Sequence, residues 1–159
     1  MKNKNREELV REFNVAMGQP DKVNLLSKNF SSELLKLRKK LISEETDEVC
    51  SEVNYIVHKL EDFNLTCPST TDIKDLFKEL GDLQYVLSGL CATYDIPMDE
   101  ILEEVHQSNM SKLDDNGKPI MRDDGKVLKG PNYQEANMMP IVENYFQKFQ
   151  KGTDEPTFI

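Results

Sequence analysis

The stretch "SELLKLRKKLISEETDEVCSEVNYIVHKLED", residues 32–62, contains neither glycine nor proline. Apolar residues return along it at helical spacing, and at 100° per residue Ile42, Val49 and Ile56 lie on one face. The stretch therefore predicts one long helix, about 45 Å in length at 1.5 Å per residue. A helix of that length suits a helical bundle or an oligomer better than a compact α/β domain.

Carboxylates interrupt the apolar face of this helix. Glu45 falls within the apolar arc, Glu48 projects on its widened side, and Glu44 lies at its edge. Most glutamates on helices are simply solvated, so one Glu-x-x-Glu pair would carry little weight alone. Burial of an unpaired charge is costly, however. Two carboxylates on a hydrophobic face therefore predict a positive charge beside them.

A second set of acids lies on the next predicted helix, from Asp72 to about Tyr94, for which Thr71 is the expected N-cap. Glu79 and Asp82 flank its apolar stripe, about 60° apart. If the two helices pack antiparallel, four or five carboxylates meet. Because Mg²⁺ prefers oxygen ligands, this pattern favours a divalent-cation site. A solvated acidic face is the alternative interpretation.

The remaining elements complete an all-α chain. Shorter helices are predicted over residues 5–17, from Met98 to about Leu113, and from about Pro140 to Gln150. Residues 114–133 carry turn signals without a helical period, so they predict a structured loop with a small hairpin. The expected fold is a four- to five-helix bundle with a structured basic loop before the C-terminal helix. We expect one domain over residues 1–159, frayed at 1–4 and 151–159.

The charge distribution separates the predicted loop from the rest of the chain. A net charge of −9 argues against general nucleic-acid binding, which needs clustered basic residues. The loop nevertheless has four basic residues close together, namely Lys118, Arg122, Lys126 and Lys129. Asn109 and Lys112 extend the apolar face of the preceding helix, where they suit an anion unless the helix end is merely frayed. Carboxylates with Mg²⁺ beside lysines are expected for phosphoryl chemistry on a nucleotide.

The lengths of the apolar runs and the spacing of the cysteines predict the cellular compartment of the protein. No apolar run is long enough to span a bilayer, and the N-terminus has no apolar segment typical of a secretory signal. Cys50, Cys67 and Cys91 form no Cys-x-x-Cys pair, so we expect buried, reduced thiols. These features predict a cytoplasmic protein without a membrane partner.

Several stretches together resemble one enzyme family. "EETDEV" (44–49) followed by "KELGDLQYVL" (78–87) resembles the EExxE…ExxD motif of the MazG-like nucleoside triphosphate pyrophosphohydrolases. "REFNVAMGQP" (11–20) and "VHQSNMSKLDDNGKPIMRDDGKVLKGPNY" (105–133) are similar to the opening helix and the C-terminal signature of one subgroup. The resemblance covers most of residues 10–133.

The resemblance implies an all-α enzyme that hydrolyses a nucleoside triphosphate to its monophosphate and pyrophosphate. The cofactor would be Mg²⁺, with Mn²⁺ as a possible substitute, and the assembly a homodimer or homotetramer. The implied metal ligands are Glu45, Glu48, Glu79 and Asp82, with Glu44 and Glu45 acting on the attacking water. The implied substrate-binding residues are Asn14, Asn109, Lys112, Arg122, Lys126, Lys129 and Tyr133.

Two departures and two alternatives accompany this resemblance. The interval between Glu48 and Glu79 is long for the family, and Asn14 stands where relatives often carry histidine. One alternative is a related all-α enzyme that acts on dUTP or phosphoribosyl-ATP. The other is a catalytically silent helical module that binds nucleotides, although the intact acids argue against it. The sequence leaves the preferred base and sugar open.

Overall fold

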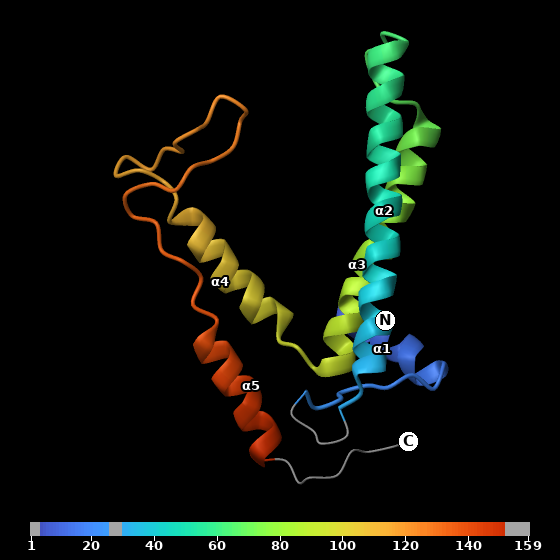
Figure 1. Ribbon diagram of the computed structural model, residues 1–159, viewed down its shortest axis with the longest axis vertical. Coiled ribbons are helices and arrows are strands. Elements are labelled where there is room, and N and C mark those ends of the chain that lie inside the picture. The colour runs from blue at the N-terminus through green and yellow to red at the C-terminus, as the bar shows by residue number, and fades with distance from the viewer. Residues whose placement is uncertain (1–3, 26–29, 152–159) are drawn as a thin grey trace. The chain divides into compact units, whose positions relative to one another are not determined.

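The computed structural model describes residues 4–25 and 30–151 of the chain (Figure 1). Their helices are α1 (Arg6–Ala16), α2 (Ser32–Asp62), α3 (Thr70–Tyr94), α4 (Met98–Met110) and α5 (Met139–Lys151). In these two ranges no extended strand forms, and Met121 and Val127 make an isolated antiparallel bridge. The predicted all-α class is confirmed.

The chain divides into two compact units, Met1–Ile96 and Pro97–Ile159, which are described separately below. The first contains α1, α2 and α3, and the second contains α4, the basic loop and α5. The single domain expected over 1–159 stays a prediction. Of the ends expected to fray, residues 1–3 and 152–159 lie outside the described part of the chain. Lys4 forms an ion pair with Glu12.

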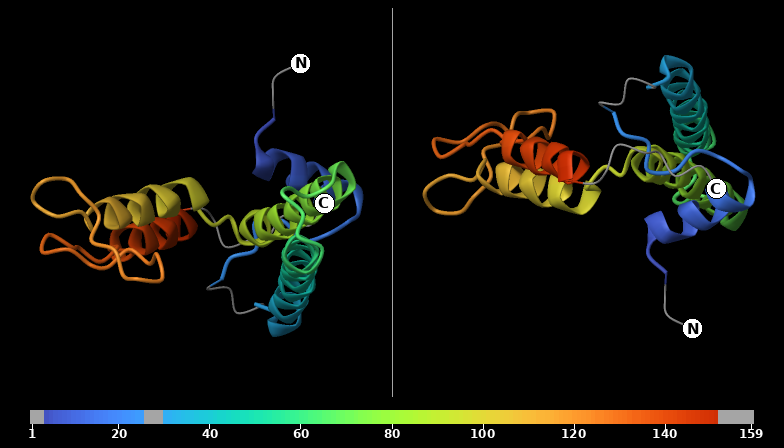
Figure 2. Two further views of the ribbon diagram at one scale, coloured as in Figure 1. Left: turned by 90° about the horizontal axis from the view of Figure 1, so that it is seen from above. Right: turned by 90° about the horizontal axis from the view of Figure 1, so that it is seen from below.

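The first unit is built on a hairpin of two long helices. α2 has the predicted bounds, because its sequence offers no residue that would end the helix earlier. α3 returns alongside it, as the different views agree (Figures 1 and 2). Near the turn, Lys59 of α2 lies 2.8 Å from the carboxylate of Asp72 of α3, whose side chain is 5% exposed. This ion pair, in which Asp72 is buried, links the two helices near the turn.

The N-cap of α3 is Ser69, so the prediction of Thr71 was wrong. The Ser69 hydroxyl accepts a hydrogen bond from the Asp72 amide at 3.3 Å. The Asp72 carboxylate accepts one from the Ser69 amide at 2.8 Å. Ser69 and Asp72 thus form a reciprocal capping box, and Thr71 lies within the first turn.

The Asp72 ion pair predicts a specific dependence of stability on pH. Hydrogen bonds from Lys59 and Ser69 lower the pKa of Asp72 from 3.8 to about 2. A lowered folded-state pKa stabilises the fold above the unfolded pKa, and this contribution is lost as pH falls through the folded value. Asp72→Asn should therefore lower the melting temperature at pH 7, and the difference should shrink as pH falls from about 4 towards 2.

Asp75→Asn is the matched control for this prediction, because Asp75 pairs with Lys74 on the surface. Exposed pairs contribute little to stability, so this variant should melt close to the parent throughout. A difference for Asp72→Asn that stays constant between pH 7 and pH 2 would contradict the assignment.

α1 packs on α3 and completes the first unit. A capping box between Asn5 and Glu8 begins the helix. Arg11 of α1 forms one ion pair with Asp21 and another, of 2.6 Å, with Asp95, the residue that follows α3. The inner face of α1 is consequently held against the end of α3, where the buried core residues Cys91, Ala92 and Tyr94 lie.

Much of the apolar surface of α2 and α3 remains open in the single chain. Phe77 is 68% exposed, Leu80 46% and Leu87 38%, although their helical spacing puts all three on the apolar stripe of α3. Contiguous exposed apolar residues mark interaction surfaces. The expectation of buried cysteines was likewise right only for Cys91, because Cys50 and Cys67 are exposed.

In the second unit, α4 and α5 lie side by side and the basic loop joins them (Figure 2). α4 ends at Met110 rather than at the predicted Leu113. The small hairpin expected within residues 114–133 turns at Asp124–Gly125, where the Arg122 amide donates to the Lys126 carbonyl at 2.8 Å and Gly125 has φ +82°. The positive φ explains the glycine at this turn.

The end of the basic loop returns to α4. The Gln134 amide donates to the Ser111 hydroxyl at 2.8 Å, and the Ser108 hydroxyl donates to the Gln134 carbonyl at 2.7 Å. Gly130 passes so close that a Cβ there would lie 2.5 Å from the Lys112 carbonyl oxygen. The loop is therefore anchored at the end of α4, beside Asn109 and the following Lys112. Within the described residues, no helix is sufficiently long and apolar to cross a membrane.

Candidate active site

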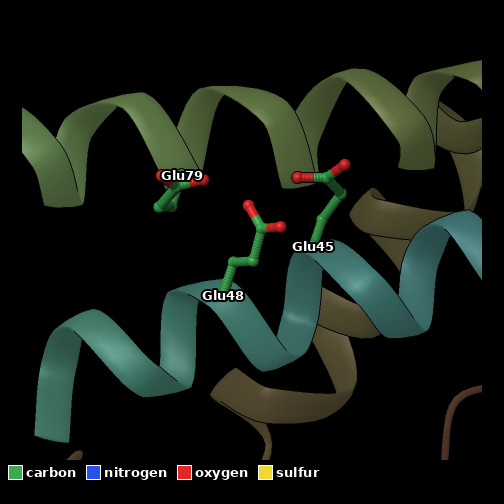
Figure 3. Close-up of side chains that lie close together, drawn as sticks. All are labelled: Glu45, Glu48 and Glu79. Carbon is green, nitrogen blue, oxygen red and sulfur yellow. The ribbon is translucent and has the colours of Figure 1, made fainter.

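Three glutamates meet between α2 and α3 in the first unit. Glu45 and Glu48 come from α2 and Glu79 from α3, and the three side chains point towards one another (Figure 3). One carboxylate oxygen from each lies within 4.8 Å of the other two. The spacing of three residues between Glu45 and Glu48 puts both on the side of α2 that faces α3. The antiparallel hairpin supplies the third carboxylate.

The neighbouring glutamates affect the ionisation of Glu48. The pKa of Glu48 is raised, chiefly by a hydrogen bond with Glu79 and then by the negative charges of Glu79 and Glu45. A hydrogen bond between two carboxyl groups requires a proton on one of them. The like charges of the three glutamates therefore repel one another when no cation neutralises them.

Lys78 partly balances this negative charge from the solvent side. Its ammonium lies 3.0 Å from a carboxylate oxygen of Glu79 and 3.0 Å from one of Asp82. These bonds raise the pKa of Lys78. Asp82 is therefore ion-paired beside the glutamates rather than gathered with them, because Lys78 precedes it by one helical turn.

Glu44 lies apart from the three glutamates. Its side chain is 49% exposed and lies 3.4 Å from Lys40, one turn earlier on α2. This position agrees with its expected place at the edge of the apolar arc. Among the five acids singled out in the sequence, the structure gathers Glu45, Glu48 and Glu79 and leaves the other two beside lysines.

The gathered carboxylates fit a hard divalent cation. Mg²⁺ and Mn²⁺ both accept carboxylate oxygen, and three such donors converge here from two rigid helices. A cation would neutralise the charges of Glu79 and Glu45, which add to the hydrogen bond with Glu79 in raising the pKa of Glu48. The chemistry of the donor set therefore suits the metal that the sequence predicted.

The expected phosphate ligands of the second unit lie at the α4 end and in the basic loop. The Lys112 ammonium donates to the Asn109 side chain at 2.6 Å. Lys129 lies 4.1 Å from the centre of the Tyr133 ring, within cation–π range. Arg122 forms an ion pair with Asp124, so its charge is balanced within the hairpin. The Lys126 side chain is exposed.

Asn14, the remaining expected substrate residue, is deeply buried on α1 with 1% exposure. Sequence reasoning missed Arg38 of α2, which is 7% exposed. The available signal was its position in the stripe that continues to Leu41 and Glu45, where a charge replaces an apolar residue. Neither the Nδ2 atom of Asn14 nor the Nε and Nη2 atoms of Arg38 find a hydrogen-bond partner among the described residues.

The chain matches the model of a known protein family. The model of the family described as phosphoribosyl-ATP pyrophosphohydrolase matches residues 10–109, which is more than half of the chain. This family is part of the MazG-like all-α superfamily. The matched range holds the acids of both helices, Asn14 and Arg38, but ends before the basic loop. No curated protein is significantly similar to the chain.

Proposed function

The chain belongs to the phosphoribosyl-ATP pyrophosphohydrolase family, and we propose that it hydrolyses a nucleoside triphosphate to the monophosphate and pyrophosphate with Mg²⁺ as cofactor. Pyrophosphohydrolases are hydrolases that act on acid anhydrides. The observation that carries the proposal is the convergence of Glu45, Glu48 and Glu79. Phosphoribosyl-ATP, which contains a triphosphate, is a second candidate substrate because the family name specifies it.

The three glutamates would hold the cation in this reaction. Bound Mg²⁺ supplies neutralisation of triphosphate charge and increased acidity of water. Protons compete with the cation for the Glu48 carboxylate, whose pKa is raised, so cation affinity falls at low pH. Asp82 would become a further ligand if its carboxylate left Lys78 and bound the cation instead. Glu44 and Glu45 would orient the attacking water and accept its proton.

The basic loop and the α4 end would bind the phosphates or the sugar of the substrate. Support comes from the concentration of positive charge in an otherwise acidic chain and from the resemblance of residues 105–133 to one MazG-like subgroup. Asn109, Lys112, Lys126, Lys129 and Tyr133 are the proposed contacts. Arg122 would join them only by leaving its ion pair with Asp124.

The position of bond cleavage tests the proposed reaction. With a nucleoside triphosphate and millimolar Mg²⁺, phosphorus NMR should show nucleoside monophosphate and pyrophosphate in equal amounts. The parallel reaction with EDTA should show neither product, because the glutamates then hold no cation. Formation of nucleoside diphosphate and orthophosphate would contradict cleavage between the α and β phosphates.

A homodimer or homotetramer is the proposed assembly. The exposed apolar side chains of α2 and α3, of which Phe77 is the most open on α3, support a second copy as the covering partner. Light scattering at micromolar concentration should therefore give a mass at least twice that of the 18.3 kDa chain. A stable 18.3 kDa species under the same conditions would refute the assembly.

A further inference from the structure

Buried hydrogen-bond donors lie where the three helices of the first unit meet. Arg38 of α2 is 7% exposed and Asn14 of α1 is 1% exposed. Within the described ranges, the Nε and Nη2 atoms of Arg38 and the Nδ2 atom of Asn14 have no acceptor. Buried polar atoms in native proteins are nearly always hydrogen-bonded, so a missing partner requires an explanation.

The surrounding residues make room for the Arg38 side chain. A Cβ at Gly89 of α3 would lie 3.3 Å from the Nη1 atom of Arg38 and 3.8 Å from Val10 of α1. Val10 precedes Asn14 by one helical turn, so both face the same side of α1. The guanidinium therefore lies against Gly89 at the level where the buried face of α1 closes the hairpin.

The distance from the glutamates also fits a role in substrate binding. Arg38 precedes Glu45 by seven residues, so it lies on the same side of α2, about 10.5 Å away along the axis at 1.5 Å per residue. A nucleotide with its phosphates at the glutamates has its base at a comparable distance. The two ends of one substrate can thus contact the same helix.

The donor groups specify the chemistry of their missing partner. Arginine has only donors and keeps its charge, and the Nδ2 atom of Asn14 is also only a donor. The structure pairs Arg38 with no described carboxylate, and burial lowers its pKa while Tyr94 acts in the opposite direction. The matching ligand is therefore rich in hydrogen-bond acceptors. An amino group is itself a donor and could not accept a hydrogen bond from these atoms.

Building on the proposed function, we propose that Arg38 and Asn14 select the substrate by binding oxygen acceptors on the part of the nucleotide remote from its triphosphate. Two groups can supply this chemistry. One is the carbonyl edge of an oxo-base, which arginine binds in a bidentate manner in other complexes. The other is a second phosphate, such as the one in a phosphoribosyl substituent. Because the donors are buried, either ligand must displace neighbouring side chains to reach them.

Matched substrates test the proposal and distinguish the two groups. ITP and ATP differ at position 6 of the purine, and UTP and CTP differ at position 4 of the pyrimidine, in each case by an oxygen or an amino group. The comparison of phosphoribosyl-ATP with ATP tests the contribution of the second phosphate. Rates of pyrophosphate release with Mg²⁺ give kcat/KM for each nucleotide. If the donors bind an oxo-base, kcat/KM should be about ten- to a hundredfold higher for ITP than for ATP and for UTP than for CTP. If they bind a second phosphate, phosphoribosyl-ATP should exceed ATP by the same factor.

Arg38→Met should bring kcat/KM for the preferred substrate to within about twofold of that for its matched partner. The change should come mainly from a higher KM for the preferred substrate. The substitution should leave the melting temperature unchanged or higher, because it removes a buried charge without a counter-charge. Arg38→Lys should restore only part of the ratio, since lysine lacks the planar fork. Lys39→Met is the matched control, because Lys39 is exposed on the same helix.

Distinct results separate the two proposals. Parent ratios within twofold for all three comparisons, or an Arg38→Met variant that keeps the parent ratio, would overturn the role of Arg38. A parent protein that hydrolyses none of these nucleotides would instead contradict the proposed function. If Arg38→Met does not fold, Asn14→Leu provides the same test, because it removes the Nδ2 donor with little change in volume. An unchanged ratio in folded Asn14→Leu would then overturn the selection role.

Discussion

Replacement of Glu48 by glutamine should lower kcat/KM for triphosphate hydrolysis by about a hundredfold or more. Glutamine keeps the shape of the side chain but removes one of the three converging negative charges. Cation binding and stabilisation of the reacting phosphate should both suffer. Glu45→Gln and Glu79→Gln should behave similarly, as measured by pyrophosphate release at millimolar Mg²⁺.

Asp47→Asn is the control for these three variants. Asp47 adjoins Glu48 in the sequence, but it is exposed and lies outside the group of three glutamates. The variant has the same change in net charge, so it should retain activity within about twofold. Equal losses in Asp47→Asn and Glu48→Gln would mean that overall charge, rather than the converging site, controls the rate.

Gly130→Ala should displace the end of the basic loop. The added Cβ would lie 2.5 Å from the Lys112 carbonyl oxygen and 2.8 Å from that of Leu113, and backbone atoms cannot move aside cheaply. The expected loss of stability in the second unit is about 2–3 kcal/mol. Lys129 and Tyr133 flank this position, so KM for the triphosphate should also rise.

Gly81→Ala is the corresponding control for stability. Nothing lies within 4 Å of a Cβ at this position, and the residue is in the middle of α3. Alanine should stabilise the helix by about 0.5–1 kcal/mol. If chemical denaturation shows Gly130→Ala to be as stable as the parent, the close approach of the loop to α4 is wrong.

Local sequence rules were sufficient for most helix bounds. α2 is continuous because no glycine or proline interrupts its apolar period, and α3 follows the same rule apart from two tolerated glycines. The N-cap of α3 was missed because Thr71 and Ser69 are both suitable cap residues. Only the position of Asp72 three residues after Ser69 distinguishes them. The end of α4 was placed too late because Lys112 and Leu113 fit the helical period.

The candidate site was predictable where it depends on one helical face. Glu45 and Glu48 gather with Glu79 because spacing and hairpin packing together determine their positions. The pairing of Asp82 with Lys78 was missed, since a lysine one turn away competes for the same carboxylate. Arg38 was missed because burial by α1 and the space beside Gly89 arise only from three-helix packing.

The matching family lies within the superfamily that the sequence resembles, and its name corresponds to the phosphoribosyl-ATP alternative. The acidic motif alone could not separate these branches. Carboxylates that hold a cation act on the phosphates, which every candidate substrate shares. Residues that contact the rest of the substrate must distinguish the branches, and Arg38 and Asn14 are positioned for such a role.

Thermal melts with EDTA and with millimolar Mg²⁺ test most directly whether the three glutamates hold a cation. Without metal, Glu48→Gln should melt above the parent near pH 7, because the raised pKa of Glu48 means that its ionised form destabilises the fold above that pKa. Mg²⁺ should raise the melting temperature of the parent and hardly that of the variant, because binding to the native state shifts unfolding by mass action. Equal Mg²⁺-induced shifts in both proteins would contradict a cation site at Glu45, Glu48 and Glu79.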